Sequence, residues 1–167
     1  DRHARAIASM HRRMAAGRSE DWMIHEFRGC ERVLDLGCGS GAHLAALRRS
    51  GVDAIGFEPS AGMIREALEQ HPELDGNILP HAMPIPAPTL AEWTGVFDGI
   101  LCNAVWMHLA RSVRPEAWRQ VRALLKPGGR LWMLVSEDRP GLDGQRRDSF
   151  GRRYEALRVD ELVDEAR

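Results

Sequence analysis

The sequence predicts an α/β domain in which a doubly wound, Rossmann-like, mostly parallel sheet lies between two layers of helices. Short apolar runs with strand character alternate with segments of helical periodicity, as in folds built from βαβ units. A glycine-rich turn over residues 37–41 joins the first run to the next helix, and 167 residues suit one compact core. Because such sheets bind ligands at the carboxyl ends of their strands, we expect the functional site at that edge.

The chain divides into an N-terminal helical segment, residues 1–28, and a sheet-containing domain, residues 29–167. A helix is predicted over residues 2–16, where apolar residues recur at helical spacing, and Gly17 provides its stop. Ser19 can cap a second, shorter helix. Both helices are therefore expected to precede the first strand.

The glycine-rich turn lies between the first predicted strand and a helix. A buried strand is predicted over residues 32–36, and the helix after the turn closes near Gly51. A second strand spans residues 52–57. Ser60 is a good N-cap for the following helix, which Pro72 ends.

The second half of the chain continues the alternation. The expected elements are a third strand, a proline-rich loop that leads straight to a fourth strand, a helix opened by a proline, a fifth strand entered through a Lys-Pro-Gly-Gly turn, a polar loop and a last helix. They cover, in this order, residues 77–79, 80–88, 97–102, 115–125, 131–135, 137–153 and 159–166.

The composition excludes several classes of protein. The formal net charge of −1 gives no electrostatic reason to expect nucleic acid or an anionic membrane as a partner. No apolar run approaches the roughly 20 residues that a membrane span needs. Three cysteines without paired spacing favour a reducing cytoplasm, and the histidines show no metal-binding spacing, so no metal site is predicted. The oligomeric state is not indicated.

The turn Gly37-Cys38-Gly39-Ser40-Gly41-Ala42 offers bare backbone and free N–H groups at a helix start. It also fits the dinucleotide fingerprint G-x-G-x-x-G/A. Glu58 follows 21 residues after Gly37, at the end of the next strand, where a carboxylate can accept both hydroxyls of a ribose. These features suit NAD and an adenosyl group equally well, so an NAD-dependent oxidoreductase stays open.

Asp35 separates the two, because dinucleotide-binding strands usually carry an apolar residue at this position. A buried carboxylate there needs a partner, and it suits a ligand with an ammonium and a sulfonium. At this point the chain resembles the class I S-adenosylmethionine-dependent methyltransferases of type 11/25. The resemblance is carried, in order, by residues 33–41, 56–60 with the nearby Met63, 97–109 and 124–131.

The resemblance implies S-adenosylmethionine as cofactor, bound by residues 29–167 beneath a lid formed by residues 1–28. It places Gly37 and Gly39 beneath the cofactor, Glu58 on the ribose and the main chain at Cys38 and Asn103 on the methionine ammonium. The full set of implied cofactor residues is Asp35, Gly37, Cys38, Gly39, Glu58, Pro59, Met63, Ala82, Met83 and Asn103.

The chain departs from the family in two places. The family usually has an acidic residue after the third strand, but here His81 precedes Ala82 and Met83, so adenine recognition is expected to rest on backbone groups and on packing of Met83. The family's sheet ends in a sixth and seventh strand paired as a hairpin. The chain stops at Arg167, so we expect that hairpin to be missing or the edge to be completed by another chain.

The function expected from the resemblance is methyl transfer, by in-line displacement, to an oxygen or nitrogen of a small-molecule acceptor. His108, six residues past the fourth strand, is the candidate general base, with a packing role as its alternative. Trp106 and Met107 wall the acceptor pocket or belong to the core. Arginines in the late loop are solvated or contact a phosphate. A non-catalytic S-adenosylmethionine-binding module is the remaining alternative to an enzyme.

Overall fold

The computed structural model describes residues 2–15, 21–137 and 139–167, so the predicted stop at Gly17 and cap at Ser19 lie outside the described residues. Its centre is a five-stranded parallel sheet with the order β3-β2-β1-β4-β5. The strands are β1 (Arg32–Leu36), β2 (Asp53–Phe57), β3 (Ile78–Leu79), β4 (Phe97–Asn103) and β5 (Leu125–Leu134). This arrangement confirms the predicted fold class.

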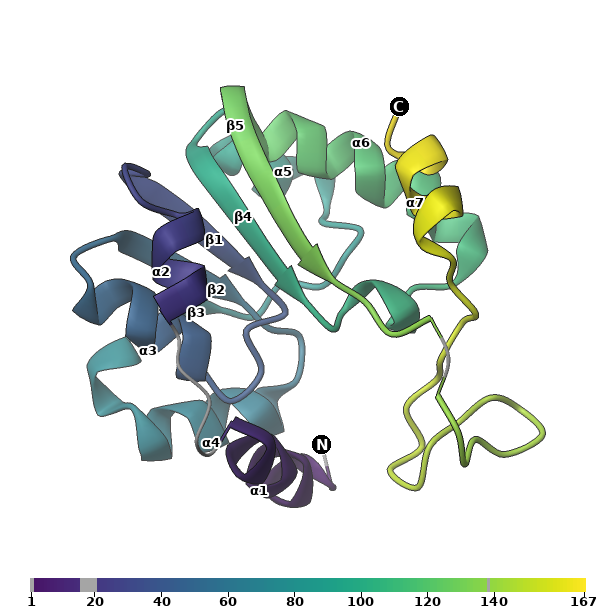
Figure 1. The fold of residues 1–167 in the computed structure, drawn as a ribbon. Helices are drawn as coiled ribbons and strands as arrows, with labels where there is room; N and C mark the ends of the chain where they lie inside the picture. The colour runs from purple at the N-terminus through teal and green to yellow at the C-terminus, as the bar shows by residue number, and fades with distance from the viewer. Residues whose placement is uncertain (1, 16–20, 138) are drawn as a thin grey trace.

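Helices cover both faces of the sheet (Figure 1). Those of the described chain are α1 (Ala4–Ala15), α2 (Asp21–Glu26), α3 (Ala42–Arg49), α4 (Ala61–Gln70), α5 (Ala87–Trp93), α6 (Arg114–Leu124) and α7 (Val159–Glu165). Helices α2 and α3 pack on one face, whereas α5, α6 and α7 pack on the other. Helix α1 lies against α4 at the carboxyl edge of the sheet. None of these helices is long and apolar enough to cross a membrane.

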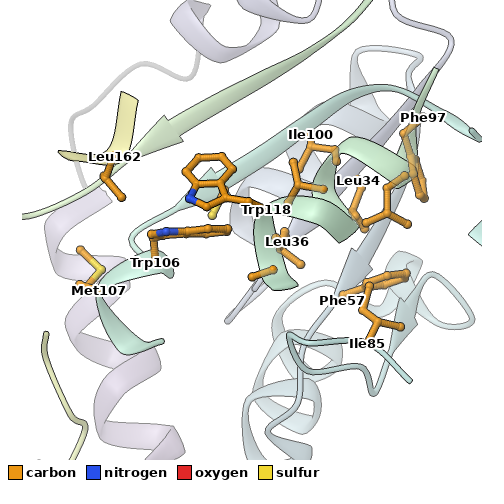
Figure 2. Packing of buried hydrophobic residues seen from close by; sticks show 14 of the residues in the cluster. Leu34, Leu36, Phe57, Ile85, Phe97, Ile100, Trp106, Met107, Trp118 and Leu162 are labelled. Atoms are coloured by element: carbon orange, nitrogen blue, oxygen red, sulfur yellow. The ribbon is translucent and has the colours of Figure 1, made fainter. Parts of the chain in front are cut away.

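The side chains of β1 alternate between two hydrophobic clusters, as the period of a strand requires. Val33 packs in the cluster beneath α2 and α3, whereas Leu34 and Leu36 pack in the larger cluster beneath α5 and α6 (Figure 2). Asp35 is two residues beyond Val33 and therefore faces the α3 side. The sheet thus directs this one carboxylate toward the start of α3.

Trp106 and Met107 belong to the core. They lie in a short 3-10 turn, Trp106–His108, that follows β4, and they are 0% and 2% exposed. The Trp106 ring packs on Trp118 of α6 with the ring centroids 4.4 Å apart (Figure 2). Of the two alternatives for this pair, the acceptor wall is therefore wrong and the core position is correct.

Two segments differ from the sequence-based expectation. The proline-rich loop does not lead straight to the fourth strand, because α5 intervenes; Pro88 lies in its first turn, where a missing N–H is tolerated. Strand β5 begins at Leu125, which was expected to face inward on the preceding helix. Leu125 pairs with Phe97 and Arg130 with Gly99, so the predicted Lys-Pro-Gly-Gly turn forms a bulge inside the strand.

A buried glutamine joins the loop after β3 to helix α6. Gln120 is 3% exposed, and its Oε1 accepts the N–H of Ile85 at 2.6 Å while its Nε2 donates to the Ile85 carbonyl at 2.9 Å. One side chain therefore satisfies both main-chain groups of a residue that no strand reaches.

In the described part of the chain beyond β5, the segment over residues 139–158 makes no hairpin strands. Its pairing is limited to an isolated antiparallel bridge between Arg147 and Arg153, and α7 follows it. The loop carries its own hydrogen bonds, among them those from Gln145 N and Arg147 N to Asp143 Oδ1, both at 2.8 Å. The loop is thus built by local contacts rather than by the sheet.

Candidate functional site

A crevice site is expected where the strand order reverses, which here is the carboxyl end of β1 between β2 and β4. The glycine turn after β1, Glu58 after β2 and Asn103 at the end of β4 all lie at this edge. The register supports the placement, because Asp35 is paired with Gly56 on one side and with Leu101 on the other. The sheet therefore brings together residues that the sequence separates widely.

The glycines of the turn are required for different reasons. Gly37, Gly39 and Gly41 all have positive φ angles, of 76°, 57° and 78°. A Cβ on Gly37 would lie 2.3 Å from Cγ2 of Val105, so packing excludes any side chain there. A Cβ on Gly39 would meet only ordinary contacts, with Met63 Cε at 3.8 Å and His11 Nδ1 at 3.9 Å. Gly39 thus presents bare backbone to side chains of α4 and α1.

Asp35 is a buried carboxylate with one oxygen unsatisfied. It is 1% exposed and accepts a hydrogen bond from the backbone of Leu44 in the first turn of α3. Its Oδ2 has no hydrogen-bond donor among the described residues. Burial, and then the nearby charge of Glu58, raise the pKa of Asp35 to about 7. An orphaned polar atom of this kind marks a place for a ligand group.

Glu58 holds the glycine turn against the start of α4. It is 8% exposed, and it accepts the N–H of Gly39 at 3.0 Å and the N–H of Ser60 at 2.8 Å. Burial raises the pKa of Glu58, and the two backbone hydrogen bonds oppose that rise. Ser60 caps α4 by accepting from Met63 N at 3.2 Å, as predicted. The bonds to the turn gave no signal in the sequence, since they depend on the distance between two loops.

The buried thiols beside this pair are packing groups. A Cβ on Gly56 would lie 2.6 Å from Cys38 Sγ, so the thiol fills the space that the glycine leaves. Burial, followed by the charge of Asp35, raises the pKa of Cys38 well above its usual value and that of Cys102 to about 12. Because the thiolate is the nucleophile, neither cysteine is activated for catalysis.

The two carboxylates fit a cationic ligand. In the described part of the chain, no arginine, lysine or histidine pairs with Asp35 or Glu58, although both are buried. Buried anions need a compensating charge, and the adenosyl sulfonium that the resemblance implies carries one together with an ammonium. A dinucleotide would instead place its anionic pyrophosphate at the glycine turn, next to Asp35.

Two histidines border the opening of the crevice. His43 Nδ1 is 3.2 Å from Asn103 Nδ2, so His43 accepts there and carries its proton on Nε2. His108 Nδ1 lies 2.7 Å from the carbonyl of Arg153 and must donate to it, which leaves Nε2 with a lone pair. Burial lowers the pKa of His108, an effect that the guanidinium of Arg152 reinforces. His108 is therefore neutral at pH 7.

The remaining residues of the implied cofactor set lie along the β2 and β3 side of the crevice. Pro59 and Ala82 are exposed, and Met83 is half-buried against the core of the α5 face. His81 packs edge-on against Phe57 with the ring centroids 4.8 Å apart. Their roles toward adenine stay predictions. Among the described residues, no three histidine, cysteine or carboxylate side chains are grouped as metal ligands.

Comparison with known proteins gives a family and several relatives. The sequence profile of the family described as "Methyltransferase domain" matches residues 33–129. A tRNA U34 carboxymethyltransferase of Pseudoalteromonas translucida is 33% identical over 59% of this chain and 30% of its own length. A ubiquinone biosynthesis O-methyltransferase of Xanthomonas oryzae pv. oryzae is 29% identical over 65% of this chain and 44% of its own length. The chain thus spans less than half the length of these curated relatives.

Solved structures share the fold. A TehB-like SAM-dependent methyltransferase from Corynebacterium glutamicum superimposes with a TM-score of 0.71 at 21% identity, over 98% of this chain and 80% of that one. A 1,6-didemethyltoxoflavin-N1-methyltransferase from Burkholderia thailandensis, solved with its substrate and S-adenosylhomocysteine, gives 0.62 at 23% identity over 84% and 60%. At these identities the likeness concerns the fold.

Proposed function

Because the chain belongs to the methyltransferase-domain family of class I S-adenosylmethionine-dependent methyltransferases, we propose that it methylates a small-molecule acceptor by in-line displacement, with His108 as general base for a hydroxyl. The observation that carries the proposal is Asp35, whose unsatisfied oxygen lies beside a turn of bare backbone. Membership in this family replaces the NAD-dependent oxidoreductase as the enzyme class.

The chain's own residues divide the cofactor between them. Asp35 supplies the negative charge for its cationic part, and Gly39 lets it approach the backbone. Glu58 spends two of its lone-pair positions on backbone N–H groups and keeps others for the ribose hydroxyls. The remaining contacts proposed for the cofactor come from Gly37, Cys38, Pro59, Met63, Ala82, Met83 and Asn103.

His108 is arranged to accept a proton. Its Nδ1–H is held by the Arg153 carbonyl, its ring rests edge-on against Tyr154 at 4.5 Å, and Nε2 remains an acceptor. When bound, the cofactor supplies an electrophilic methyl group and a thioether leaving group. The acceptor proton goes to His108 Nε2, the acceptor oxygen bonds to the methyl carbon, and the carbon–sulfur bond breaks with its electron pair kept by sulfur.

A small molecule is favoured over tRNA, although a tRNA-modifying protein is among the relatives. The late-loop arginines that could contact a phosphate are committed within the loop: Arg146 Nε donates to the Tyr154 carbonyl and Arg147 Nη1 to the Gly151 carbonyl, both at 2.8 Å. Arg153 pairs with Glu155 at 2.7 Å. With a net charge of −1, the chain offers little for a polyanion.

The N-terminal helix is proposed as a lid over the cofactor. Helix α1 packs on α4 through a small cluster that contains Ala8 and Met63, and this contact holds His11 above Gly39. Residues 29–167 then form the cofactor-binding domain proper. A cytoplasmic location is part of the proposal, supported by three free cysteines.

The His108→Gln variant tests the catalytic part of the proposal. Calorimetry with S-adenosylmethionine should give wild-type affinity, because His108 lies outside the cofactor contacts. Methyl transfer to hydroxyl acceptors in a metabolite panel should fall by about 10²–10⁴-fold. Full activity of the variant would remove His108 from catalysis. Cofactor binding without turnover by the wild-type protein on any acceptor, tRNA included, would favour the non-catalytic module.

A further inference from the structure

Three separate segments converge on the opening of the crevice. The ring of Phe150, in the loop after β5, lies 5.8 Å from the ring of His3 ahead of α1. Tyr154 of the same loop packs on His108. His11 of α1 lies close enough to His43, His108 and Arg152 for their charges to act on its imidazole. The loop after β5 therefore shares this opening with α1 and the turn after β4 (Figure 1).

The loop brings two guanidinium groups to one carboxylate. Arg152 Nε donates to Asp148 Oδ2 at 2.9 Å, and Arg139 Nη2 lies 3.8 Å from the same oxygen. Asp148 Oδ1 is already occupied by the backbone N–H groups of Phe150 and Arg152, at 2.9 and 3.0 Å. Arg139 also lies over the Tyr154 ring, 4.6 Å from its centroid. Two positive charges and one negative charge leave one cation uncompensated.

Arg152 has an unused donor at this place. Its Nη2 is buried and lies 2.7 Å from Asp148 Oδ2, yet among the described residues it makes no hydrogen bond. The Arg152 side chain is 22% exposed, so a ligand can reach the rest of the guanidinium. A partly buried cation without a full partner favours an anion, and guanidinium matches a carboxylate in a bidentate way.

We propose that Arg152 forms a carboxylate-binding subsite at the opening of the crevice, next to His108. This subsite rests on the proposed function, and its carboxylate comes from the acceptor or from the methionine end of the cofactor. In either case Arg152 orients a ligand through its carboxylate and leaves His108 Nε2 facing the reacting hydroxyl. Arg139 and Asp148 keep the guanidinium in place.

Calorimetry with named probes tests the subsite. S-adenosylhomocysteine is titrated into wild type, Arg152→Gln and Arg147→Gln, and then benzoate and the neutral, isosteric benzamide are titrated into each cofactor-loaded protein. If the acceptor supplies the carboxylate, wild type binds benzoate at least tenfold more tightly than benzamide, and Arg152→Gln abolishes this preference with unchanged S-adenosylhomocysteine affinity. If the cofactor supplies it, Arg152→Gln lowers S-adenosylhomocysteine affinity at least tenfold. Either result supports the subsite.

The controls separate the subsite from the fold and from the proposed function. Arg147→Gln lies in the same loop, with its guanidinium on a main-chain carbonyl, and should match wild type in both titrations. Arg152→Lys keeps the charge without the fork and should give an intermediate effect. Unchanged binding of both probes by Arg152→Gln overturns the subsite, as does an equal loss in Arg147→Gln. Failure of wild type to bind S-adenosylhomocysteine would instead overturn the proposed function.

Discussion

Replacing Asp35 with asparagine should stabilise the ligand-free protein above neutral pH while weakening cofactor binding. In the folded chain the pKa of Asp35 is raised from 3.8 to about 7, chiefly by burial. Between these two values the unfolded chain has released a proton that the folded chain still holds. The free energy of unfolding therefore falls as pH rises through this window, and above pH 7 the full cost of a buried charge remains.

The size of the effect follows from the gap between the two pKa values. At about 1.4 kcal/mol for each pH unit, ionised Asp35 costs the folded state about 4 kcal/mol above pH 7. Asparagine does not titrate, although its amide leaves donors unsatisfied where Oδ2 now lies, at a cost of about 1–3 kcal/mol. That cost is independent of pH. The advantage of Asp35→Asn over wild type should thus grow by about 2–3 kcal/mol between pH 5 and pH 8.

Urea unfolding at pH 5, 6, 7 and 8, followed by circular dichroism, measures this advantage directly. Asp75→Asn, an exposed substitution, serves as control and should stay within about 0.5 kcal/mol of wild type at each pH. Calorimetry at pH 8 should show S-adenosylmethionine bound at least about tenfold more weakly by Asp35→Asn, since a charge-assisted contact is lost. A difference in unfolding free energy that does not change with pH would refute the reasoning.

Further predictions concern the same crevice. Gly37→Ala should lower the free energy of unfolding by about 2–4 kcal/mol in urea, because its Cβ would overlap Val105; a small effect would contradict that packing. Gly39→Ala should cost only about 1 kcal/mol, for its positive φ, yet abolish calorimetric binding of S-adenosylhomocysteine. Glu58→Gln should weaken that binding by about 1–2 kcal/mol, and unchanged affinity would argue against a ribose contact. Near pH 7, cofactor binding by wild type should release a proton from Asp35, detected as buffer-dependent calorimetric heats that Asp35→Asn lacks.

Local patterns in the sequence predicted the elements whose signals are local. The strand over residues 32–36 and the capping of α4 by Ser60 are observed as expected, because alternation and a hydroxyl at the helix start act over a few residues. Helix α5 was missed because prolines dominate its start, and proline reads as a loop signal unless the first helical turn is recognised. The early start of β5 depends on its partner strand, which local pattern does not contain.

The candidate site was predicted in its membership but not in its connections. Asp35, Glu58 and the glycines were selected by spacing after successive strands, and the sheet does bring them to one edge. The hydrogen bond from Gly39 N to Glu58, the donor role of His108 Nδ1 and the shared partner of Arg139 and Arg152 all join residues far apart in the chain. Such contacts follow from tertiary packing, which a single sequence does not specify.

The paired hydrogen bonds of Gln120 have a consequence for how the crevice keeps its width. They fasten the segment that bears Ala82 and Met83 to α6, the helix that continues the chain from the turn of His108. The adenine end and the acceptor end of the crevice therefore share one strut, and neither can drift without dragging the other. Gln120→Leu would keep the bulk but strand both main-chain groups of Ile85, and slackening should then be felt at both ends together.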